Sequence, residues 1–274
     1  STRTGNVPEE SKLSLLTAIH ASAACSAAHQ GVVDVCDAQL QRAQMLSEDR
    51  AAGGPSMAVV RAVLLRHEAR ITVLSDSRGN ESTSSISAIY SKVTAWLSSH
   101  RAHLHVLNER MEATLMLANV QARWALHQLR TGCNTLSQTT AWPQRLELAE
   151  SALETVVARP DVSVLIRTKA LESAVGMYDG VISSLPVTDD HHVQGLVRAL
   201  SDGLVLGSAY CRARVPRLFK VLATRPDSAA EREAQERLRR APAWVFLSFV
   251  PQLVSMMGTY RGSLLHETLL RTAR

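Results

Sequence analysis

The chain has 274 residues, of which 46% are hydrophobic and only 4% aromatic, and its formal net charge is +5. This length can bury a sizeable core in one large domain or two small ones. A charge of +5 spread over 274 residues lacks the concentrated basic stripe that is typical of nucleic-acid binding, and no segment offers the roughly 20 apolar residues that span a bilayer. Because the chain begins with Ser1, we expect a processed product or part of a longer protein.

The first part of the chain predicts helical repeats over residues 1–74. Apolar residues recur at three- and four-residue steps after Glu10, which predicts helices over about 10–31, 32–45 and 56–74. The polar segment 75–85 is predicted to be a linker or loop.

Further helices are expected in the second part, residues 86–274. Their predicted ranges are 86–97, 103–129, 143–157, 164–185, 191–206, 215–223 and 228–240. No strand alternation persists, so the sequence predicts an all-α fold. Helix pairs recur about every 35–45 residues, which suits an α-solenoid of antiparallel pairs with irregular tetratricopeptide- or HEAT-like repeats.

The C-terminal stretch 241–274 contains a nearly uninterrupted apolar block from Trp244 to Met257. A helix that is apolar on all sides is expected in a packed interior. We therefore expect this block to form a central helix, followed by a short helix around 264–270.

Several clusters of polar residues resemble sites, but ordinary structural roles account for them better. His100, His103 and His105 do not share one helix face well, so we expect solvated or capping histidines rather than a metal site. The run 189–192, Asp-Asp-His-His, fits the start of a helix that Thr188, Asp189 or Asp190 caps, with acids at its positive N-terminal end. The sequence also shows no phosphate loop and no kinase motif, so we expect no catalytic, cofactor or metal residues in this chain.

Neither the basic residues nor the cysteines indicate a functional site. Arg237, Arg239 and Arg240 end a predicted helix, where cations complement the helix dipole. The cysteines have neither zinc nor disulfide spacing, so we expect buried free thiols in a reducing, intracellular compartment; they are Cys25, Cys36, Cys133 and Cys211.

The C-terminal stretch resembles the end of the FAT domain of phosphatidylinositol-3-kinase-related kinases, most closely the ataxia-telangiectasia-mutated (ATM) kinase family. The resemblance rests on P-A-W-V-F-L-S-F-V-P-Q-L-V-S-M-M-G-T at 242–259 and G-S-L-L-H-E-T-L at 262–269. Ser248 departs from the proline of that family. Segments 169–183 and 191–205 extend the resemblance to roughly the last 110 residues. The positions that carry it or pack with it are Pro242, Trp244, Phe246, Leu247, Gln252, Leu253, Met257, Gly258, Thr259, Gly262, His266, Glu267 and Leu269.

This resemblance implies a non-catalytic helical scaffold in a large nuclear Ser/Thr kinase of the DNA-damage response. Its expected partners are the kinase domain of the same polypeptide, a second copy in a homodimer and other proteins, with no nucleic-acid or membrane site. ATP and Mg would then bind in the adjoining kinase domain. Two alternatives stay open: a stand-alone helical-repeat scaffold that binds proteins, and a structural component of an RNA–protein assembly.

Overall fold

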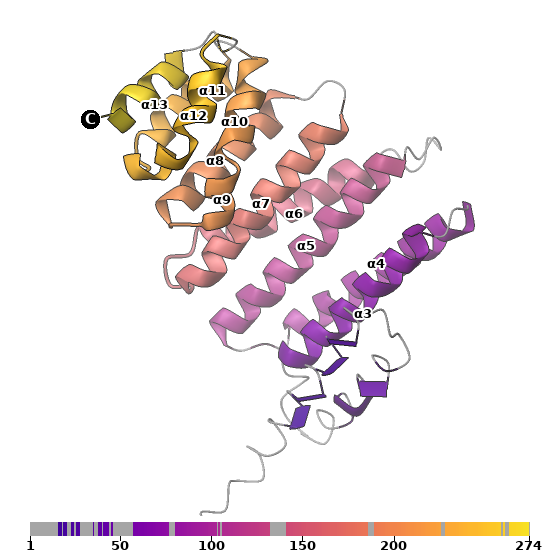
Figure 1. Ribbon diagram of the computed structural model, residues 1–274. Coiled ribbons are helices and arrows are strands. Elements are labelled where there is room, and N and C mark those ends of the chain that lie inside the picture. Colours follow the sequence, from indigo (N-terminus) through magenta and orange to yellow (C-terminus); the bar gives the residue numbers. More distant parts are fainter. Residues whose placement is uncertain are drawn as a thin grey trace, which may run out of the picture. The chain divides into compact units, whose positions relative to one another are not determined.

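A computed structural model describes scattered positions between residues 16 and 45 and nearly all of the chain after residue 56 (Figure 1). The continuous described ranges are 57–76, 80–102, 106–131, 141–185, 189–225, 228–258 and 263–273, with the single residues Leu104 and Tyr260. Throughout these residues the regular structure is helical, which confirms the all-α prediction. The chain divides into two compact units, Ser1–Val120 and Gln121–Arg274.

The N-terminal unit contains α3 (Met57–Asp76), α4 (Asn80–Ala102) and the first half of α5 (Leu107–Thr131). α3 packs on α4. A cluster of apolar side chains from these helices and α5 forms a core; its members are Val60, Val93 and Leu97, with Leu64, Ile89, Trp96, Met116, Leu117 and Val120 packed against them. Arg61 of α3 also forms an ion pair with Glu112 of α5.

The predicted linker is much shorter than the sequence suggested. α3 extends through Asp76 and α4 begins at Asn80, so only 77–79 of the segment 75–85 lie outside the described helices. The boundary between the two units falls within α5, between Val120 and Gln121. The run of Ser, Asn and Asp predicts a linker, but the weak helix propensity of these residues does not stop α3 and α4 from extending into it.

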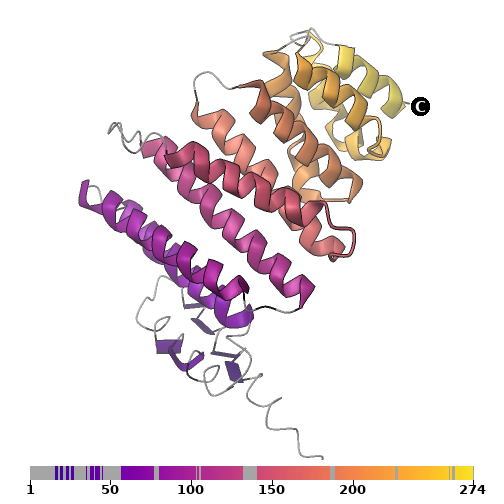
Figure 2. The ribbon, with the colours of Figure 1, turned by 180° about the vertical axis from the view of Figure 1, so that it is seen from behind.

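The C-terminal unit is a succession of helices, most of which pack on a neighbour in the sequence, while some pack on helices further along the chain (Figure 2). It continues from α5 through α6 (Ala141–Val157), α7 (Val164–Ser184), α8 (Asp190–Val205), α9 (Ala209–Ala213), α10 (Val215–Ala223), α11 (Ala229–Leu238), the 3₁₀ helix η1 (Ala243–Phe249), α12 (Val250–Met256) and α13 (Ser263–Ala273). α6 packs on α7, α7 on α8, α8 on α11, and α11 on α13. Contact between successive helix pairs is the arrangement that helical-repeat proteins use.

α8 is the helix around which the C-terminal unit is packed. It contacts α7, α9, α10 and α11, and more than half of its residues are buried. Two glycines allow this close approach, because the positions of their missing β-carbons are occupied: at Gly195 by the ring of Tyr178, and at Gly203 by Cys211. α8 therefore has the central place that the sequence suggested for the block from Trp244 to Met257.

The C-terminal apolar block is not one buried helix, which corrects the sequence prediction. It forms η1 and then α12, and Trp244 is 55% exposed. Pro251 lies in the first turn of α12 and has no N–H to continue a preceding helix, so the chain starts a new helix there. Apolar composition alone therefore overstated how deeply this segment is buried.

Candidate functional site

The C-terminal stretch presents some of its apolar side chains inward and others outward. Phe246 and Leu253 are fully buried. Four large apolar residues are about half exposed, and we call them the C-terminal apolar surface: Trp244, Leu247, Val254 and Met257. Residues three apart eclipse one another on a 3₁₀ helix, so Trp244 and Leu247 share one face of η1. Because η1 packs on α12, these exposed side chains belong to adjoining elements.

Other residues of the FAT resemblance lie mostly at the surface. Pro242, Gln252, Gly258 and His266 are exposed, and Glu267 is half-buried and accepts a hydrogen bond from Nε of Arg239 at 2.6 Å. Leu269 is partly buried, whereas Thr259 and Gly262 lie outside the described residues. Of the described residues that carry the resemblance, Phe246 and Leu253 are buried and most of the others are exposed.

Arg271 fixes the position of this stretch from α13. Its guanidinium donates hydrogen bonds to the carbonyl oxygens of Leu238 and Ala241, at 2.9 and 2.6 Å, and lies 5.5 Å from the ring centroid of Phe246. Burial lowers the pKa of Arg271 from its usual value. Arg271 therefore links α13 to the end of α11 and to the segment before η1, and the Leu238 carbonyl accepts its bond in addition to one from the backbone N–H of Ala241.

The basic cluster at the end of α11 is neutralised by carboxylates. Arg237 pairs with Glu233 and Asp202, Arg239 with Glu267, and Arg240 with Glu236. Each of the three arginines thus has an acidic partner. This arrangement does not form the concentrated basic patch that nucleic-acid binding uses.

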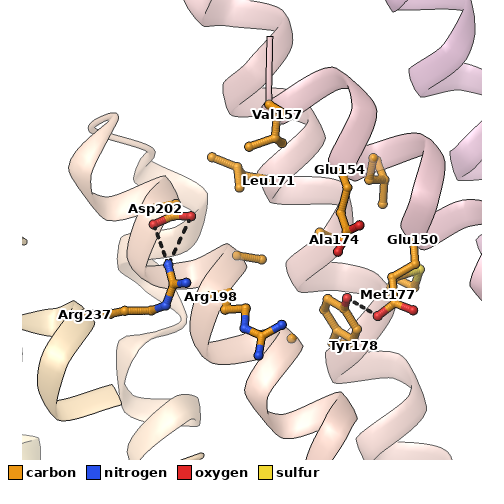
Figure 3. A pocket seen from close by; sticks show the side chains of 14 residues that line it. Glu150, Glu154, Val157, Leu171, Ala174, Met177, Tyr178, Arg198, Asp202 and Arg237 are labelled. Atoms are coloured by element: carbon orange, nitrogen blue, oxygen red, sulfur yellow. Dashed lines mark hydrogen bonds and ion pairs between the residues drawn. The ribbon is translucent and has the colours of Figure 1, made fainter. Parts of the chain in front are cut away.

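A pocket of about 380 Å³ lies in the C-terminal unit among α6, α7, α8 and α11 (Figure 3). Apolar side chains and a glycine supply most of its lining: Leu153, Val157, Ala158, Leu171, Ala174, Met177, Gly195 and Ala199. The polar groups that complete the lining are Glu150, Glu154, Tyr178, Arg198, Asp202 and Arg237. A concave, mainly apolar site with a few charged groups is the usual form of a ligand pocket.

Tyr178 and Glu150 form one polar group of the pocket. The Tyr178 hydroxyl donates a hydrogen bond to Oε1 of Glu150, and Nε2 of His191 lies 3.1 Å from the same oxygen. Burial, this hydrogen bond and the charge of Glu150 raise the pKa of Tyr178 well above its usual value. Tyr178 therefore stays a neutral hydrogen-bond donor rather than a base or nucleophile.

The two arginines of the pocket share a carboxylate that lies beside it. Arg198 donates to Glu233 from Nε at 2.7 Å and from Nη2 at 3.4 Å, and Nε of Arg237 donates to Glu233 at 2.9 Å. Arg237 also pairs with Asp202, at 3.2 Å. Partial burial raises the pKa of Glu233, but the hydrogen bonds and charges of both arginines outweigh it, so this pKa is lowered. Both guanidiniums are thus compensated before any ligand binds.

The histidine run at residues 100–105 is only partly described. His100 is buried and its ring stacks on Trp96 with 5.4 Å between centroids, while His103 and His105 lie outside the described residues. Within the described residues no group of His, Cys, Asp and Glu side chains could hold a metal ion.

The run 189–192 lies at the start of α8, as predicted, and also contacts other parts of the chain. Asp189 occupies the cap position of α8, although its side chain makes no capping hydrogen bond. Asp190 pairs with Arg225, and His191 pairs with Glu150 beside the pocket. This run is therefore an interhelical contact as well as a helix start.

Among the cysteines, Cys211 is a buried free thiol, as the sequence predicts, and burial raises the pKa of its thiol. Cys25, Cys36 and Cys133 lie outside the described residues. A buried thiol with a raised pKa is not a nucleophile.

Sequence reasoning missed the pocket. Its members come from four helices, and single residues such as Glu154 and Arg198 look like ordinary surface charges in the sequence. One signal was present: Glu147, Glu150 and Glu154 place acids on successive turns of α6. That spacing alone does not show that Glu150 and Glu154 meet an apolar cavity.

The fold and these sites define an all-α protein with neighbour-to-neighbour helix packing, an exposed apolar surface and a pocket of mixed polarity. No protein-family model, curated protein or solved structure matches the chain. In the described part of the chain, no helix is long and apolar enough to cross a membrane.

Proposed function

We propose that this protein is a non-catalytic helical scaffold that docks a folded protein domain on its C-terminal apolar surface. The observation that carries the proposal is the half exposure of Trp244, Leu247, Val254 and Met257 on two adjoining elements. Contiguous exposed apolar groups commonly mark protein-interaction sites, and tryptophan is prominent among residues that dominate binding energy.

Buried and hydrogen-bonded residues of the same stretch support this surface. Phe246 of η1 and Leu253 of α12 are fully buried, and Arg271 donates hydrogen bonds to the carbonyl oxygens of Leu238 and Ala241, which precede η1. A preorganised surface loses little conformational entropy when a partner binds. Each of these side chains is already about half buried, so covering the rest contributes roughly half of the 1.5–3 kcal/mol that full burial gives, before the costs of association.

The FAT resemblance gives this proposal its specific form. It favours a kinase domain of the phosphatidylinositol-3-kinase-related class as the docked domain, with a second copy of the chain as a further partner. A stand-alone helical-repeat scaffold for another protein is the second form, and the neighbour-to-neighbour packing of α6, α7 and α8 fits it equally well. An RNA–protein assembly is less favoured, because the sharpest basic cluster is ion-paired.

Site-specific photo-cross-linking tests the proposal. A benzoylphenylalanine placed at Trp244 or at Met257 is expected to form adducts in cells of the source organism, with the partner identified by mass spectrometry. The matched control carries the same group at Lys169, an exposed position of α7 away from the C-terminal stretch.

The outcomes separate the forms of the proposal. A kinase domain of the stated class in the adducts supports the FAT-type function, and a second copy of this chain supports the dimer contact. One other defined protein, cross-linked at both positions and not at Lys169, supports the stand-alone scaffold. If positions 244 and 257 give no more adduct than position 169, the C-terminal apolar surface is not a docking site and the proposal fails.

A further inference from the structure

The pocket among α6, α7, α8 and α11 is lined by both apolar and acidic side chains. Leu153, Val157 and Leu171 are among its apolar residues. Figure 3 shows the Glu154 carboxylate and the Arg198 guanidinium pointing toward the space between the surrounding helices. The pocket therefore offers an aliphatic stem a place to pack and a charged head a place to bind.

The charges of the pocket favour a cation. Three carboxylates line it, those of Glu150, Glu154 and Asp202, together with the guanidiniums of Arg198 and Arg237. Glu233, which pairs with both arginines, adds a fourth carboxylate next to the pocket. Four carboxylates against two guanidiniums leave an excess of negative charge.

The carboxylates of the pocket that form no ion pair with a described arginine, Glu150 and Glu154, lie on α6. Arg198 and Arg237 are already engaged by Glu233, and Asp202 is engaged by Arg237. Glu154 has no ion pair with any described residue, although its charge helps to raise the pKa of Arg198 in the same pocket. The contacts of Glu150 with Tyr178 and His191 both go to Oε1, so within the described chain Oε2 of Glu150 accepts no hydrogen bond.

We propose that this pocket binds a guanidinium or ammonium group carried on an aliphatic stem. The carboxylates of Glu154 and Glu150, one turn apart on α6, receive the cation, and the stem packs against Leu153, Val157 and Leu171. Charge-assisted hydrogen bonds to carboxylates are the stronger kind, and long basic side chains bury their stems along apolar surface while the head stays near water. Such a group is carried by an arginine or lysine of a partner segment and by small free amines.

This site goes beyond the proposed docking function. It is lined by α6, α7, α8 and α11, whereas the C-terminal apolar surface lies on η1 and α12. The two proposals can therefore fail independently: a negative result at one site says nothing about the other.

The test follows the methyl signals of Met177 and Ala174 by NMR while small probes are added to the full chain. n-Pentylguanidinium and n-hexylammonium are expected to shift these signals in a saturable way, whereas hexanoate, which has a similar stem and the opposite charge, is not. Glu154→Gln is expected to weaken binding of both cations about five- to tenfold, as befits the loss of one charge-assisted contact in an open site. Glu154 is exposed, so this substitution should not disturb folding.

Glu147→Gln is the matched control. Glu147 lies on the same helix, is exposed and does not line the pocket, so this variant is expected to bind the cations as the unchanged protein does. Three results would each overturn the proposal. Hexanoate could bind as tightly as the cations, no probe could give a saturable shift, or Glu147→Gln and Glu154→Gln could have equal effects.

Two short peptides distinguish the sources of the cation. The first is Gly-Ser-Arg-Ser-Gly with blocked ends, and the second has citrulline, a neutral isostere, in place of arginine. Tighter binding of the arginine peptide than of pentylguanidinium assigns the pocket to a partner's basic side chain. Equal or weaker binding assigns it to a small amine. In both cases the citrulline peptide must bind less well than the arginine peptide, and the inference fails if it does not.

Discussion

The aromatic ring of Tyr178 occupies the space where a β-carbon of residue 195 would lie, so α7 and α8 can pack as they do only because residue 195 is glycine. Tyr178 also lines the pocket, and its hydroxyl donates a hydrogen bond to Glu150. One contact thus sets both the separation of two helices and one wall of the cavity.

Gly195→Ala is expected to destabilise the C-terminal unit by about 1–3 kcal/mol, because a methyl group overpacks this contact with a buried ring. Urea unfolding followed by circular dichroism measures the change. Gly176→Ala is the control: its added methyl meets only the Tyr210 hydroxyl, the end of a partly exposed side chain, at 3.1 Å. Alanine favours a helix over glycine, so this control should be neutral or stabilising. Equal stability of the two variants would show that Tyr178 does not fill this space.

Stability is expected to fall at alkaline pH because of two tyrosines. Burial and hydrogen bonds to Glu150 and Glu231 raise the pKa of Tyr178 and Tyr260, respectively, above the usual value. The folded state therefore holds these protons more tightly than the unfolded state, so the stabilisation is complete below pH about 10 and is lost as the pH rises beyond it. Thermal unfolding between pH 9 and 11 should show a fall in Tm that becomes smaller in the double variant Tyr178→Phe, Tyr260→Phe. A pH dependence that the double variant leaves unchanged would assign the fall to other groups.

Glu233→Gln is expected to lower the free energy of unfolding at pH 7 by about 1 kcal/mol, since Glu233 pairs with two arginines that are themselves partly exposed. The net pKa of Glu233 is lowered in the folded state. Its stabilisation is thus present above the unfolded pKa, near 4.3, and is lost as the pH falls through the folded value. Urea unfolding at pH 7 and at pH 3 should show the gap between the two proteins closing in acid. Glu236→Gln, at an exposed carboxylate of the same helix, should have little effect at either pH.

Substitutions in the C-terminal stretch should separate folding from binding. Phe246→Ala is expected to cost about 3–5 kcal/mol, because it leaves a cavity at a fully buried site. Trp244→Ser, at a side chain that is 55% exposed, should change the stability by about 1 kcal/mol or less. Differential scanning calorimetry of both variants measures this contrast. A large loss of stability in Trp244→Ser would mean that Trp244 is part of the core rather than of a docking surface.

The sequence predicted the helical elements well where local signals were strong. The helix predicted over about 215–223 has its observed bounds; Pro216 lies in its first turn, where a proline is tolerated. α9, only five residues long, gave no such pattern and was missed. Its position depends on Ser208, whose side chain accepts a hydrogen bond from the backbone N–H of Cys211.

Burial was predicted less well than helix position. Val245 and Phe246 are buried while Trp244 and Leu247 are exposed, although all four are apolar neighbours in the sequence. The hydrophobicity of a residue indicates how much free energy its burial contributes, but it does not indicate which neighbours will cover the side chain. The pocket could not be predicted for the same reason, since only tertiary packing brings Glu154 and Arg198 to the same cavity.

The hydrogen bonds between side chains of different helices in the C-terminal unit join residues close in the sequence. Their separations run from 24 positions, for Arg145 and Gln121, to 41, for His191 and Glu150. Closing such short loops costs little entropy, so this unit should reach its native state quickly and without waiting for distant segments to meet. It should also open in stages: α13 can detach from η1, α12 and α11 while the pairing of α6, α7 and α8 persists. Hydrogen exchange should then be fastest at the C-terminal end and slowest in α8.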